Sequence, residues 1–396
     1  MRAGRQVLIL EARGRVGGRC WTRRLPGIST PIELGAEFIH GRPDVTLRLL
    51  QKAGLAPVDS VRKSRAAEDG KLVPINAFAE AQRAVRDAVV HKDVSFATFL
   101  ARRRMRARTR TFAKLMVQGF DAADPARVSA RSIVEEWGSG TSMGASQPRP
   151  AGGYGPLLEG LAAEALGDGA RLRLEAVVRE IRWRRGTVEM ESDFLGKRFV
   201  ERARQAIVTL PLGVLQAGTV RFRPPLRDKR SALERLGSGP VIKAALWFER
   251  AFWEERSPGT AFFHAPRSAF PTFWTPLPAR VPLLIAWAGG PKAERLPRLA
   301  DENLIEQALR GARAVFGRIP PLAAALVHDW RRDPFARGAY SYVLVDGEGA
   351  REKLAESVAD TLYFAGEATD TAGEAGTVAG ALQSGVRAAR QLLEAT

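Results

Sequence analysis

Glycines and charged residues are combined in two short segments at opposite ends of the sequence. In the first, the apolar run Gln6–Leu10 ends at Glu11, and Gly17, Gly18 and Arg19 follow. A continuous apolar run is typical of a strand buried on both faces of a parallel sheet. An acid at such a strand end can bind ribose hydroxyls, paired glycines let backbone approach a ligand, and an arginine can pair with a pyrophosphate. The alternative is a glycine-rich turn with a solvated arginine.

The second segment has the order strand, loop and helix. The apolar run Leu362–Ala365 ends at Gly366 and Glu367, and a polar loop leads to Thr377 and Val378, where a long periodic helix begins. The N–H groups at a helix N-terminus favour negative charge. A plain strand–helix crossover does not need the glycines of this segment. The segment therefore predicts a second wall of the same ligand site.

A lysine interrupts an otherwise apolar, strand-like run in the middle of the chain. Lys243 lies within Val241–Phe248, whose other residues are all apolar. A buried lysine has a depressed pKa and can act in its neutral form as both donor and acceptor. We therefore interpret Lys243 as a functional residue. The alternative is a lysine on a solvent-facing side of the strand, with its stem packed and its ammonium in water.

The composition is that of a globular protein of two domains. The 396 residues are 45% hydrophobic and 26% charged, and a single core stops growing at roughly 250–300 residues. No apolar run approaches the roughly 18 residues that a membrane span needs. A lone cysteine, Cys20, excludes an internal disulfide and a multi-cysteine zinc site. The four histidines show no metal-ligand spacing, so no metal site is expected.

The chain is strongly basic, with 61 Lys and Arg, 43 Asp and Glu, and a net charge of +18. Such a surplus can indicate a polyanionic partner. We interpret it instead as arginines scattered over the surface, because no nucleic-acid fold motif accompanies it, and no nucleic-acid partner is expected. The densest cluster predicts a helix with a solvated basic face. Its members are Arg102, Arg103, Arg104, Arg106, Arg108 and Arg110.

A glycine fingerprint, G-x-G-x-x-G, should precede the acid of such a site by about 20 residues. Counting back from Glu11 passes Met1, and Met1–Gly4 has the pattern of a helix tail with a glycine stop. We expect an in-frame extension upstream of Met1 in the source gene to encode the fingerprint. A stop codon directly upstream would contradict this expectation.

Five collinear motifs resemble those of the flavin-containing amine oxidases, the family of monoamine oxidases, polyamine oxidases and flavin histone demethylases. They span essentially the whole chain. In chain order, the matching segments are the second-strand signature at 11–22, the Glu33–Gly41 motif, an internal leucine-proline motif at 209–215, the Trp330–Tyr342 motif and a C-terminal FAD motif at 364–381. The second of these, Glu33–Gly41, is most similar to the polyamine-oxidase branch.

The resemblance implies an α/β fold in which two domains are interleaved, an architecture like that of glutathione reductase. A Rossmann-like FAD-binding domain, truncated at its N-terminus, would take residues 1–58, 150–238 and 345–396. An α+β substrate-binding domain would take residues 59–149 and 239–344. The first part of the substrate domain reads as helices over 77–90 and 96–120. The second part reads as strands over 241–248, 272–274, 283–287 and 325–330.

The resemblance also implies an activity. A hydride leaves the carbon next to an amine nitrogen for flavin N5, the imine hydrolyses, and O2 reoxidises the flavin to give H2O2. In the family, the lysine at the position of Lys243 reaches N5 through a water. Glu11 would bind the adenosine ribose, Val178 would meet adenine through its backbone, and Glu367 would meet the ribityl chain. The remaining cofactor residues would be Arg13, Gly17, Gly18, Arg19, Gly35, Ala36, Glu37, Phe38, Gly366, Thr377 and Val378.

Three further residues match substrate positions of the family. Tyr340 and Trp330 match aromatic positions near the flavin, where aromatics can clamp an amine and exclude water. Core packing is the alternative for Trp330. His40 would face the substrate amine, although a satisfied buried histidine remains possible. Ala339 occupies the place of the cysteine that carries covalent flavin in monoamine oxidases, so FAD is expected to be non-covalent.

The expected partner is a small-molecule amine, with O2 as electron acceptor. Polyamine, monoamine and amino acid stay open in that order, and the sequence sets no oligomeric state. An L-amino-acid oxidase or a flavin desaturase on the same fold is one alternative. An inactive flavoprotein-like scaffold is another, because the fingerprint is missing. With no visible signal peptide, the expected location is the cytoplasm.

Overall fold

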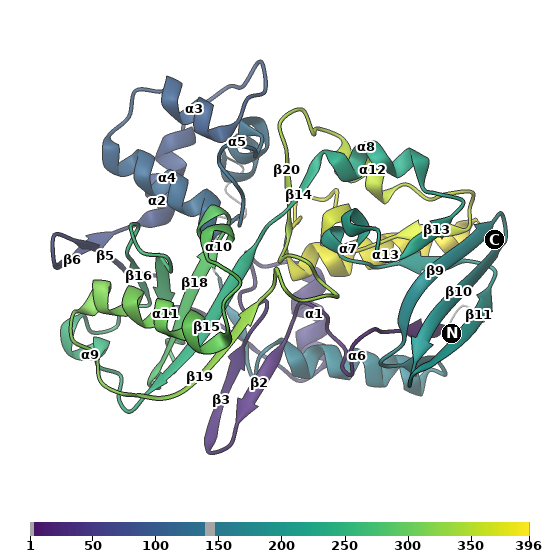
Figure 1. Ribbon diagram of the computed structural model, residues 1–396, viewed down its shortest axis with the longest axis horizontal. Helices are drawn as coiled ribbons and strands as arrows, with labels where there is room; N and C mark the ends of the chain where they lie inside the picture. Colours follow the sequence, from purple (N-terminus) through teal and green to yellow (C-terminus); the bar gives the residue numbers. More distant parts are fainter. Residues whose placement is uncertain (1–3, 139–146, 396) are drawn as a thin grey trace.

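The computed structural model describes residues 4–138 and 147–395, and Figure 1 shows them as two lobes. The nucleotide lobe lies at the right of the view and carries both chain ends. The sheet lobe lies at the left. Among the described residues, no helix combines the length and the apolar character that a membrane crossing requires.

The nucleotide lobe is built on two parallel strand pairs and one mixed sheet. Strand β1 (Leu8–Leu10) pairs in parallel with β8 (Arg171–Arg173), and β12 (Ala206–Val208) pairs in parallel with β21 (Leu362–Phe364). Within the described residues, no strand joins these two pairs into one sheet. The expectation of an upstream segment stays a prediction. Residues 1–3 of the expected helix tail lie outside the described part of the chain.

A four-stranded sheet and several helices complete this lobe. The sheet has the order β11-β10-β9-β13, and the helices α1, α6 and α13 lie beside the parallel pairs (Figure 1). The bounds are β9 Val177–Arg184, β10 Thr187–Phe194, β11 Lys197–Ala203, β13 Arg221–Arg223, α1 Asp44–Lys52, α6 Tyr154–Gly167 and α13 Val378–Glu394.

The sheet lobe contains a seven-stranded sheet of order β19-β15-β18-β17-β16-β5-β6. Strand β15, second in this order, pairs antiparallel on both sides, with β18 and β19. Helix α11 (Asp301–Phe316) packs across this sheet. The strands are β5 Ser64–Glu68, β6 Lys71–Ile75, β15 Val241–Phe248, β16 Phe262–His264, β17 Thr272–Trp274, β18 Leu283–Gly289 and β19 Leu322–Asp329. The strands expected at 241–248 and 272–274 are confirmed at both ends.

The helical part of the sheet lobe differs from the expectation in two respects. The single helix expected over 96–120 is wrong, because the chain forms α3 (Phe96–Arg102) and α4 (Ala107–Gly119), separated by extended backbone at Arg103. A run of adjacent arginines repels itself, and separation into two elements relieves this repulsion. The six arginines therefore do not share one helix face. The hairpin β5–β6 was also not expected in this mainly helical stretch.

The chain passes between the lobes at two adjacent points. Strand β4 (Pro57–Val58) pairs antiparallel with β7 (Arg149–Pro150). These are the positions where the sequence predicts the chain to leave and re-enter the first domain. The division into domains stays a prediction, but the pairing places Arg149 at a seam between the lobes.

Candidate active site and cofactor cavity

A cavity of about 1240 Å³ is lined by residues of both lobes. Pockets for small molecules usually have volumes of roughly 300–1,000 Å³, so this one has room for a large ligand beside a small one. It brings together every residue that the sequence singles out. These are Glu11, Arg13, Gly17, Gly18, Arg19, Gly35, Ala36, Glu37, Phe38, His40, Val178, Lys243, Trp330, Tyr340, Gly366, Glu367, Thr377 and Val378.

One end of the cavity has the features expected for a nucleoside. Glu11 follows β1 directly, and its Oε1 accepts a hydrogen bond from the backbone N–H of Arg13 (2.8 Å). Burial raises the pKa of Glu11, although the Arg13 N–H opposes this rise. The Arg13 guanidinium makes two hydrogen bonds to Asp333 (2.8 and 2.6 Å) and lies over the Phe335 ring. Its side chain is therefore committed to the protein, while Val178 borders the cavity from β9.

The glycine loop between the lobes is shaped by close backbone contacts. Gly18 has φ +55°, and a Cβ there would meet no protein atom within 4 Å, so backbone and open space adjoin. A Cβ at Gly35 would lie 1.9 Å from the carbonyl oxygen of Arg19. Only glycine allows this approach. The backbone N–H of Ala36 then donates to the same Arg19 carbonyl (3.1 Å).

Arg19 and Glu367 form an ion pair across the cavity wall. The Arg19 Nη1 lies 2.8 Å from Glu367 Oε1, and Glu367 Oε2 accepts from the backbone and hydroxyl of Ser341 (3.2 and 2.7 Å). Burial opposes ionisation of Glu367, but Arg19 and Arg351 together lower its pKa. The two residues predicted for the pyrophosphate and the ribityl chain therefore already neutralise each other.

Helix α13 directs its N-terminus into the cavity. Thr377 caps it, since its Oγ1 accepts from Gly380 N–H (3.0 Å) and donates to the Glu374 carbonyl (2.6 Å). Among the described residues, the N–H groups of Val378 and Ala379 meet no protein acceptor. Free N–H groups and the dipole of a 17-residue helix both favour negative charge on a ligand here.

Lys243 lies at the centre of a buried charged cluster. Its Nζ donates to Glu37 Oε2 (2.7 Å) and to the Gly35 carbonyl (3.1 Å). Glu37 Oε1 accepts from Arg149 Nε (2.8 Å) and Trp274 Nε1 (2.9 Å). Burial opposes ionisation of Glu37, but Lys243 and Arg149 outweigh it and lower the pKa to about 2. The sequence predicts a buried Lys243 but not the carboxylate of Glu37 beside it.

The alternation of β15 explains why a lysine occupies this strand. Ile242, Ala244 and Leu246 point into one apolar core, and the opposite face, with Ala245, packs in another core beside the Glu33–Phe38 segment. Lys243 is fully buried on that second face. A solvent-facing lysine is therefore wrong. Two of the three N–H donors of an ammonium are used by protein acceptors, which leaves one for the cavity.

The predicted substrate residues have distinct surroundings. Burial lowers the pKa of His40 to about 4, and its Nδ1 is a buried atom that meets no hydrogen-bond partner among the described residues. The Tyr340 hydroxyl donates to the Phe120 carbonyl (2.7 Å), and burial raises its pKa. Trp330 is 2% exposed and its Nε1 donates to the Leu34 carbonyl (2.9 Å). Trp330 therefore both packs in a core and borders the cavity.

Two cavity carboxyls were missed from the sequence. Asp121 follows α4, and Glu136 lies on α5 (Ala130–Gly138). Burial raises the pKa of Asp121 well above its usual value, and neighbouring Glu136 raises it further. The pKa of Glu136 is also raised by burial, although Arg351 opposes this rise. No local pattern marks two acids fifteen positions apart, because only the fold brings them together.

Within the described ranges, no three His, Cys, Asp or Glu side chains gather as a metal site would require. The aromatic lining is extensive by contrast. Besides the two predicted aromatics, the cavity is bordered by Phe38, Phe78, Phe120, Phe262, Trp274, Trp287, Phe335 and Tyr342.

Comparison with known proteins identifies the chain's relatives. The family model for flavin-containing amine oxidoreductases matches residues 1–393. The chain belongs to this family. The members of this family are flavin-containing oxidoreductases that act on amines, and FAD is the cofactor that the family implies. The α/β amine-oxidase fold expected from the motifs is confirmed by solved structures.

The relatives of this amine oxidoreductase are of two kinds. The chain is 33% identical over 251 residues to the "Lysine-specific histone demethylase 1B" of Mus musculus. This match covers 61% of this chain and 29% of that protein. It is 29% identical over 429 residues to "Lysine-specific histone demethylase 1 homolog 2" of Oryza sativa subsp. japonica, covering 100% of this chain and 55% of that protein. The chain thus spans between about a third and about half the length of these relatives.

The structural relatives are small-amine oxidases. Putrescine oxidase bound to putrescine has a TM-score of 0.84 at 22% identity, covering 99% of this chain and 94% of that one. Cyclohexylamine oxidase from Brevibacterium oxydans has a TM-score of 0.79 at 21% identity, with the same coverage of both chains. At this identity the likeness shows the fold.

The cavity of this amine oxidoreductase fits FAD on the chemistry of its donors. Glu11 presents a carboxylate at one end, the backbone of Gly18 adjoins open space, and free N–H groups of α13 face the other end. Such a set suits ribose, pyrophosphate and the electron-poor pyrimidine of a flavin.

Proposed function

We propose that this enzyme is an oxidase of polyamine-like substrates with non-covalently bound FAD. The substrate gives a hydride from the carbon next to nitrogen, the imine hydrolyses to a carbonyl compound, and O2 accepts the two electrons to form H2O2. When bound, the flavin supplies the hydride acceptor. The residues of the chain bind and orient the amine, exclude water and hold charge around it.

The carboxyl pair in the cavity is the observation that carries the substrate class. Burial raises the pKa of both Asp121 and Glu136, because two adjacent buried charges are disfavoured. The pair therefore binds a proton more readily than isolated carboxylates do. A substrate ammonium can take the place of that proton and be stabilised by both oxygens. Polyamines carry a second ammonium at a distance from the one that is oxidised. The pair therefore suits the distal nitrogen of a diamine or polyamine.

The surroundings of the reacting nitrogen favour its neutral form, which is the form that gives up hydride. His40 is neutral near pH 7, since burial lowers its pKa to about 4. It can therefore accept a hydrogen bond from the amine without adding charge. The aromatic walls formed by Trp330, Tyr340 and their neighbours exclude water. A dry, uncharged pocket disfavours an ammonium at this point.

The proposed cofactor contacts follow from where each residue borders the cavity. Lys243 has one donor left for a water beside flavin N5, and Glu37 holds its ammonium in place. Glu11 is the proposed ribose ligand, and the N–H group of Val378 is the proposed pyrimidine donor. The expected Thr377 N–H is less suited, because it already donates to the Glu374 carbonyl (3.3 Å). Cys20 is the only thiol of the chain, and burial raises its pKa to about 12. A protonated thiol is a poor nucleophile, which supports non-covalent FAD.

A substrate panel tests this proposal. Anaerobic bleaching of the flavin absorbance would be followed with a diamine, a monoamine, an L-amino acid and a peptide with N-methylated lysine. We expect the diamine to react with the highest kcat/KM. The family relatives favour the methylated peptide as the second candidate, because their names describe histone demethylases. A higher kcat/KM for the amino acid or the peptide would refute the polyamine assignment.

The variant Asp121→Asn tests the carboxyl pair directly. Truncating one partner of a buried charged contact costs about 2–5 kcal/mol, so kcat/KM for the diamine should fall by roughly 30-fold or more, at 1.4 kcal/mol per tenfold. The value for the monoamine should change little. Asp124→Asn is the matched control, since Asp124 lies in the same loop, accepts from Ala126 N–H (2.9 Å) and does not border the cavity. Equal losses for diamine and monoamine would contradict a distal-ammonium role.

A further inference from the structure

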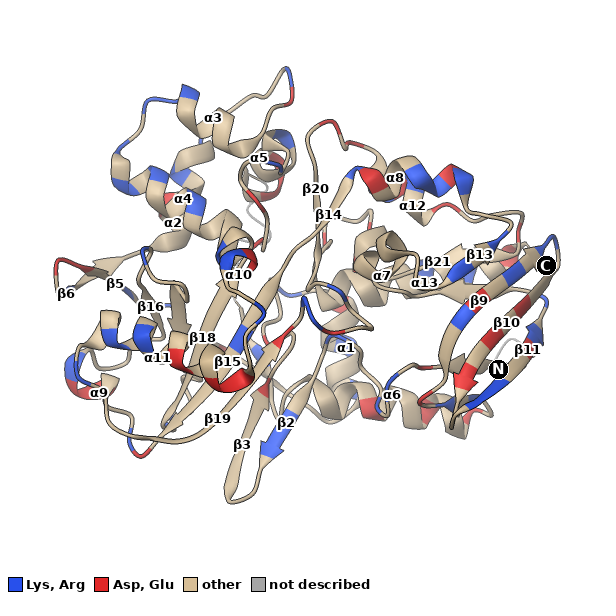
Figure 2. Ribbon diagram, viewed as in Figure 1, with Lys and Arg blue, Asp and Glu red and all other residues tan. Residues whose placement is uncertain are grey.

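The positive charge of the chain is concentrated on the helical part of the sheet lobe. Residues 83–114 contain ten Lys and Arg but only two Asp and Glu, a net +8 of the +18 carried by 396 residues. The ends of α2 (Ala77–Val85), α3 and α4 and the loops between them carry this charge (Figure 2). We name this the basic surface. Its members are Arg83, Arg86, Arg102, Arg103, Arg104, Arg106, Arg108, Arg110 and Lys114, exposed or half-buried.

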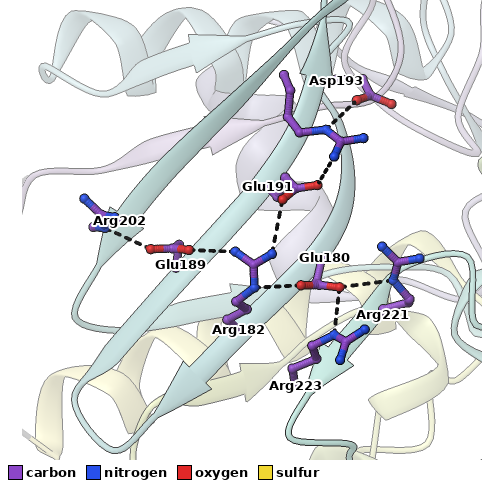
Figure 3. Close-up of polar contacts among 9 residues, drawn as sticks. Glu180, Arg182, Glu189, Glu191, Asp193, Arg202, Arg221 and Arg223 are labelled. Carbon is purple, nitrogen blue, oxygen red and sulfur yellow. Dashed lines mark hydrogen bonds and ion pairs between the residues drawn. The ribbon is translucent and has the colours of Figure 1, made fainter.

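The arginines of the nucleotide lobe are arranged differently. On the four-stranded sheet, Arg182 contacts Glu180, Glu189 and Glu191, and Arg202 contacts Glu189, so that positive and negative side chains alternate (Figure 3). That surface is charged but locally balanced. The basic surface is therefore an exception to the scattered arrangement that the sequence predicts for much of the surplus.

Most cations of the basic surface lack a carboxylate. Within the described part of the chain, the side chains of Arg102, Arg104, Arg106 and Lys114 make no ion pair and no hydrogen bond to protein. Arg103 and Arg110 donate only to backbone carbonyls, of Arg86 and Arg103. Unpaired guanidinium groups on one surface repel each other and attract polyanions. This repulsion destabilises the free protein, and a bound anionic partner would offset it.

The position of the charges on α4 adds to that cost. Arg106 is the N-cap of α4, Arg108 lies in its first turn, and no acidic residue is present there. Cations at the positive end of a helix dipole are each unfavourable by about 0.3–1 kcal/mol. Stability alone would favour acids at these positions. The arrangement is what a surface for binding negative charge requires.

The basic surface is separate from the cavity. The C-terminal end of α4 borders the cavity through Leu115, Met116 and Gly119, whereas the arginines cluster at its N-terminal end. A helix of 13 residues is about 20 Å long at 1.5 Å per residue. A partner on the basic surface would therefore leave the active site open.

We propose that the basic surface is a docking site for the phosphate backbone of a nucleic acid. Eight of its nine cations are arginines, and planar guanidinium groups match phosphate oxygens in pairs. A membrane surface is the less fitting partner, because docking on lipid also uses apolar side chains. Of the large apolar side chains in residues 83–114, only Val89 is prominently exposed. We expect this binding to be independent of the base sequence, because the contacts are made to phosphates.

The test measures binding of the FAD-loaded full chain to a labelled DNA duplex of mixed sequence. Anisotropy would be recorded from about 50 to 200 mM salt. The first variant combines Arg102→Gln, Arg104→Gln and Arg106→Gln. The control combines Arg185→Gln, Arg198→Gln and Arg202→Gln, which removes the same charge from exposed arginines that pair with carboxylates. None of these six residues borders the cavity.

We expect the wild type to bind, and the slope of log K against log salt to become shallower by about 2–3 in the first variant, at about 0.9 per lost phosphate contact. The control variant should keep most of the slope. Equal losses in both variants, or no binding of the wild type, would overturn the proposal. Tighter binding to phosphatidylserine vesicles than to the duplex would also overturn it in favour of a membrane. Because the readout is binding, the outcome is independent of the proposed oxidase substrate.

Discussion

Replacing Glu37 with glutamine removes one charge from the buried cluster and leaves its shape nearly intact. The carboxylate contacts Lys243 at 2.7 Å, Arg149 at 2.8 Å and the indole N–H of Trp274 at 2.9 Å. The side chain of Lys243 is 1% exposed and that of Arg149 is 14% exposed. In Glu37→Gln, both cations remain buried without their shared anion.

The loss in the free energy of unfolding of Glu37→Gln can be estimated in two ways. The pKa of Glu37 falls from 4.5 to about 2, which corresponds to about 3 kcal/mol at 1.36 kcal/mol per pH unit. Breaking a buried ion pair by removing one partner costs about 3–5 kcal/mol. We therefore expect Glu37→Gln to lower the free energy of unfolding by about 3–5 kcal/mol near pH 7. The flavin content should fall as well, because Lys243 and the Gly35–Phe38 backbone lose their common anchor.

Urea unfolding of the wild type and the variant between pH 3 and 8 measures this difference. A carboxylate with a depressed pKa stabilises the folded state above its unfolded pKa of 4.5, and this stabilisation is lost as the pH falls toward about 2. The gap between wild type and Glu37→Gln should therefore be constant above pH 5 and shrink below pH 4.5. The double variant Glu37→Gln with Lys243→Met should recover part of the loss.

Two results would refute this reasoning. A loss below about 1 kcal/mol, the usual limit for a surface pair, would show that the cluster is not energetically buried. A loss that stays constant down to pH 3 would show that glutamine disturbs packing and that the charge is not the cause. Glu33→Gln is the internal control, because it alters a second buried glutamate four positions away.

Three further predictions concern residues around the same site. Burial raises the pKa of Glu33 to about 7, so its ionisation should destabilise the wild type as the pH rises from 4.5 to 7. In urea unfolding at pH 8, Glu33→Gln should therefore be more stable than the wild type by up to about 3 kcal/mol. Gly35→Ala should lower both the urea midpoint and the bound-flavin absorbance, because its Cβ would lie 1.9 Å from the Arg19 carbonyl. Gly18→Ala should lower the urea midpoint less, because its Cβ meets no atom within 4 Å and only the backbone strain at φ +55° remains. Burial lowers the pKa values of His40 and His264 to about 4, so NMR of the imidazole rings at pH 5.5 should find both neutral; a protonated His40 would remove the basis for its role as acceptor.

The sequence predicts the elements whose signals are local. The strand Val241–Phe248 and the start of α13 at Val378 agree with the structure because an apolar run and a glycine-flanked cap are properties of neighbouring residues. The division of 96–120 into two helices was missed, because the apolar flanks of the arginine cluster continue the helical period across it. Charge repulsion at Arg103 prevailed over that period.

The residues named as site residues all border the cavity, because the resemblance carries positions along the chain. Their roles stay predictions, and the contacts between them were not predicted. The contact between Lys243 and Glu37 joins residues 206 positions apart, and the Asp121–Glu136 pair depends on how α4 and α5 pack. Such contacts exist only in the folded chain. Sequence therefore indicates which residues face the ligand, and the fold determines which of them are charged.

Arg149 ties the two lobes in a way that constrains how the enzyme moves. It lies at the crossover strand β7, and its guanidinium donates to Glu37 and to the carbonyls of Leu277 and Thr275 (3.0 and 3.2 Å) while it stacks over Phe38 at 4.4 Å. A clamshell motion of the lobes would separate these partners and strand a buried carboxylate. Since that costs several kcal/mol, these contacts oppose a hinge motion between the lobes. Arg149 therefore helps to hold the walls of the cavity at a fixed separation.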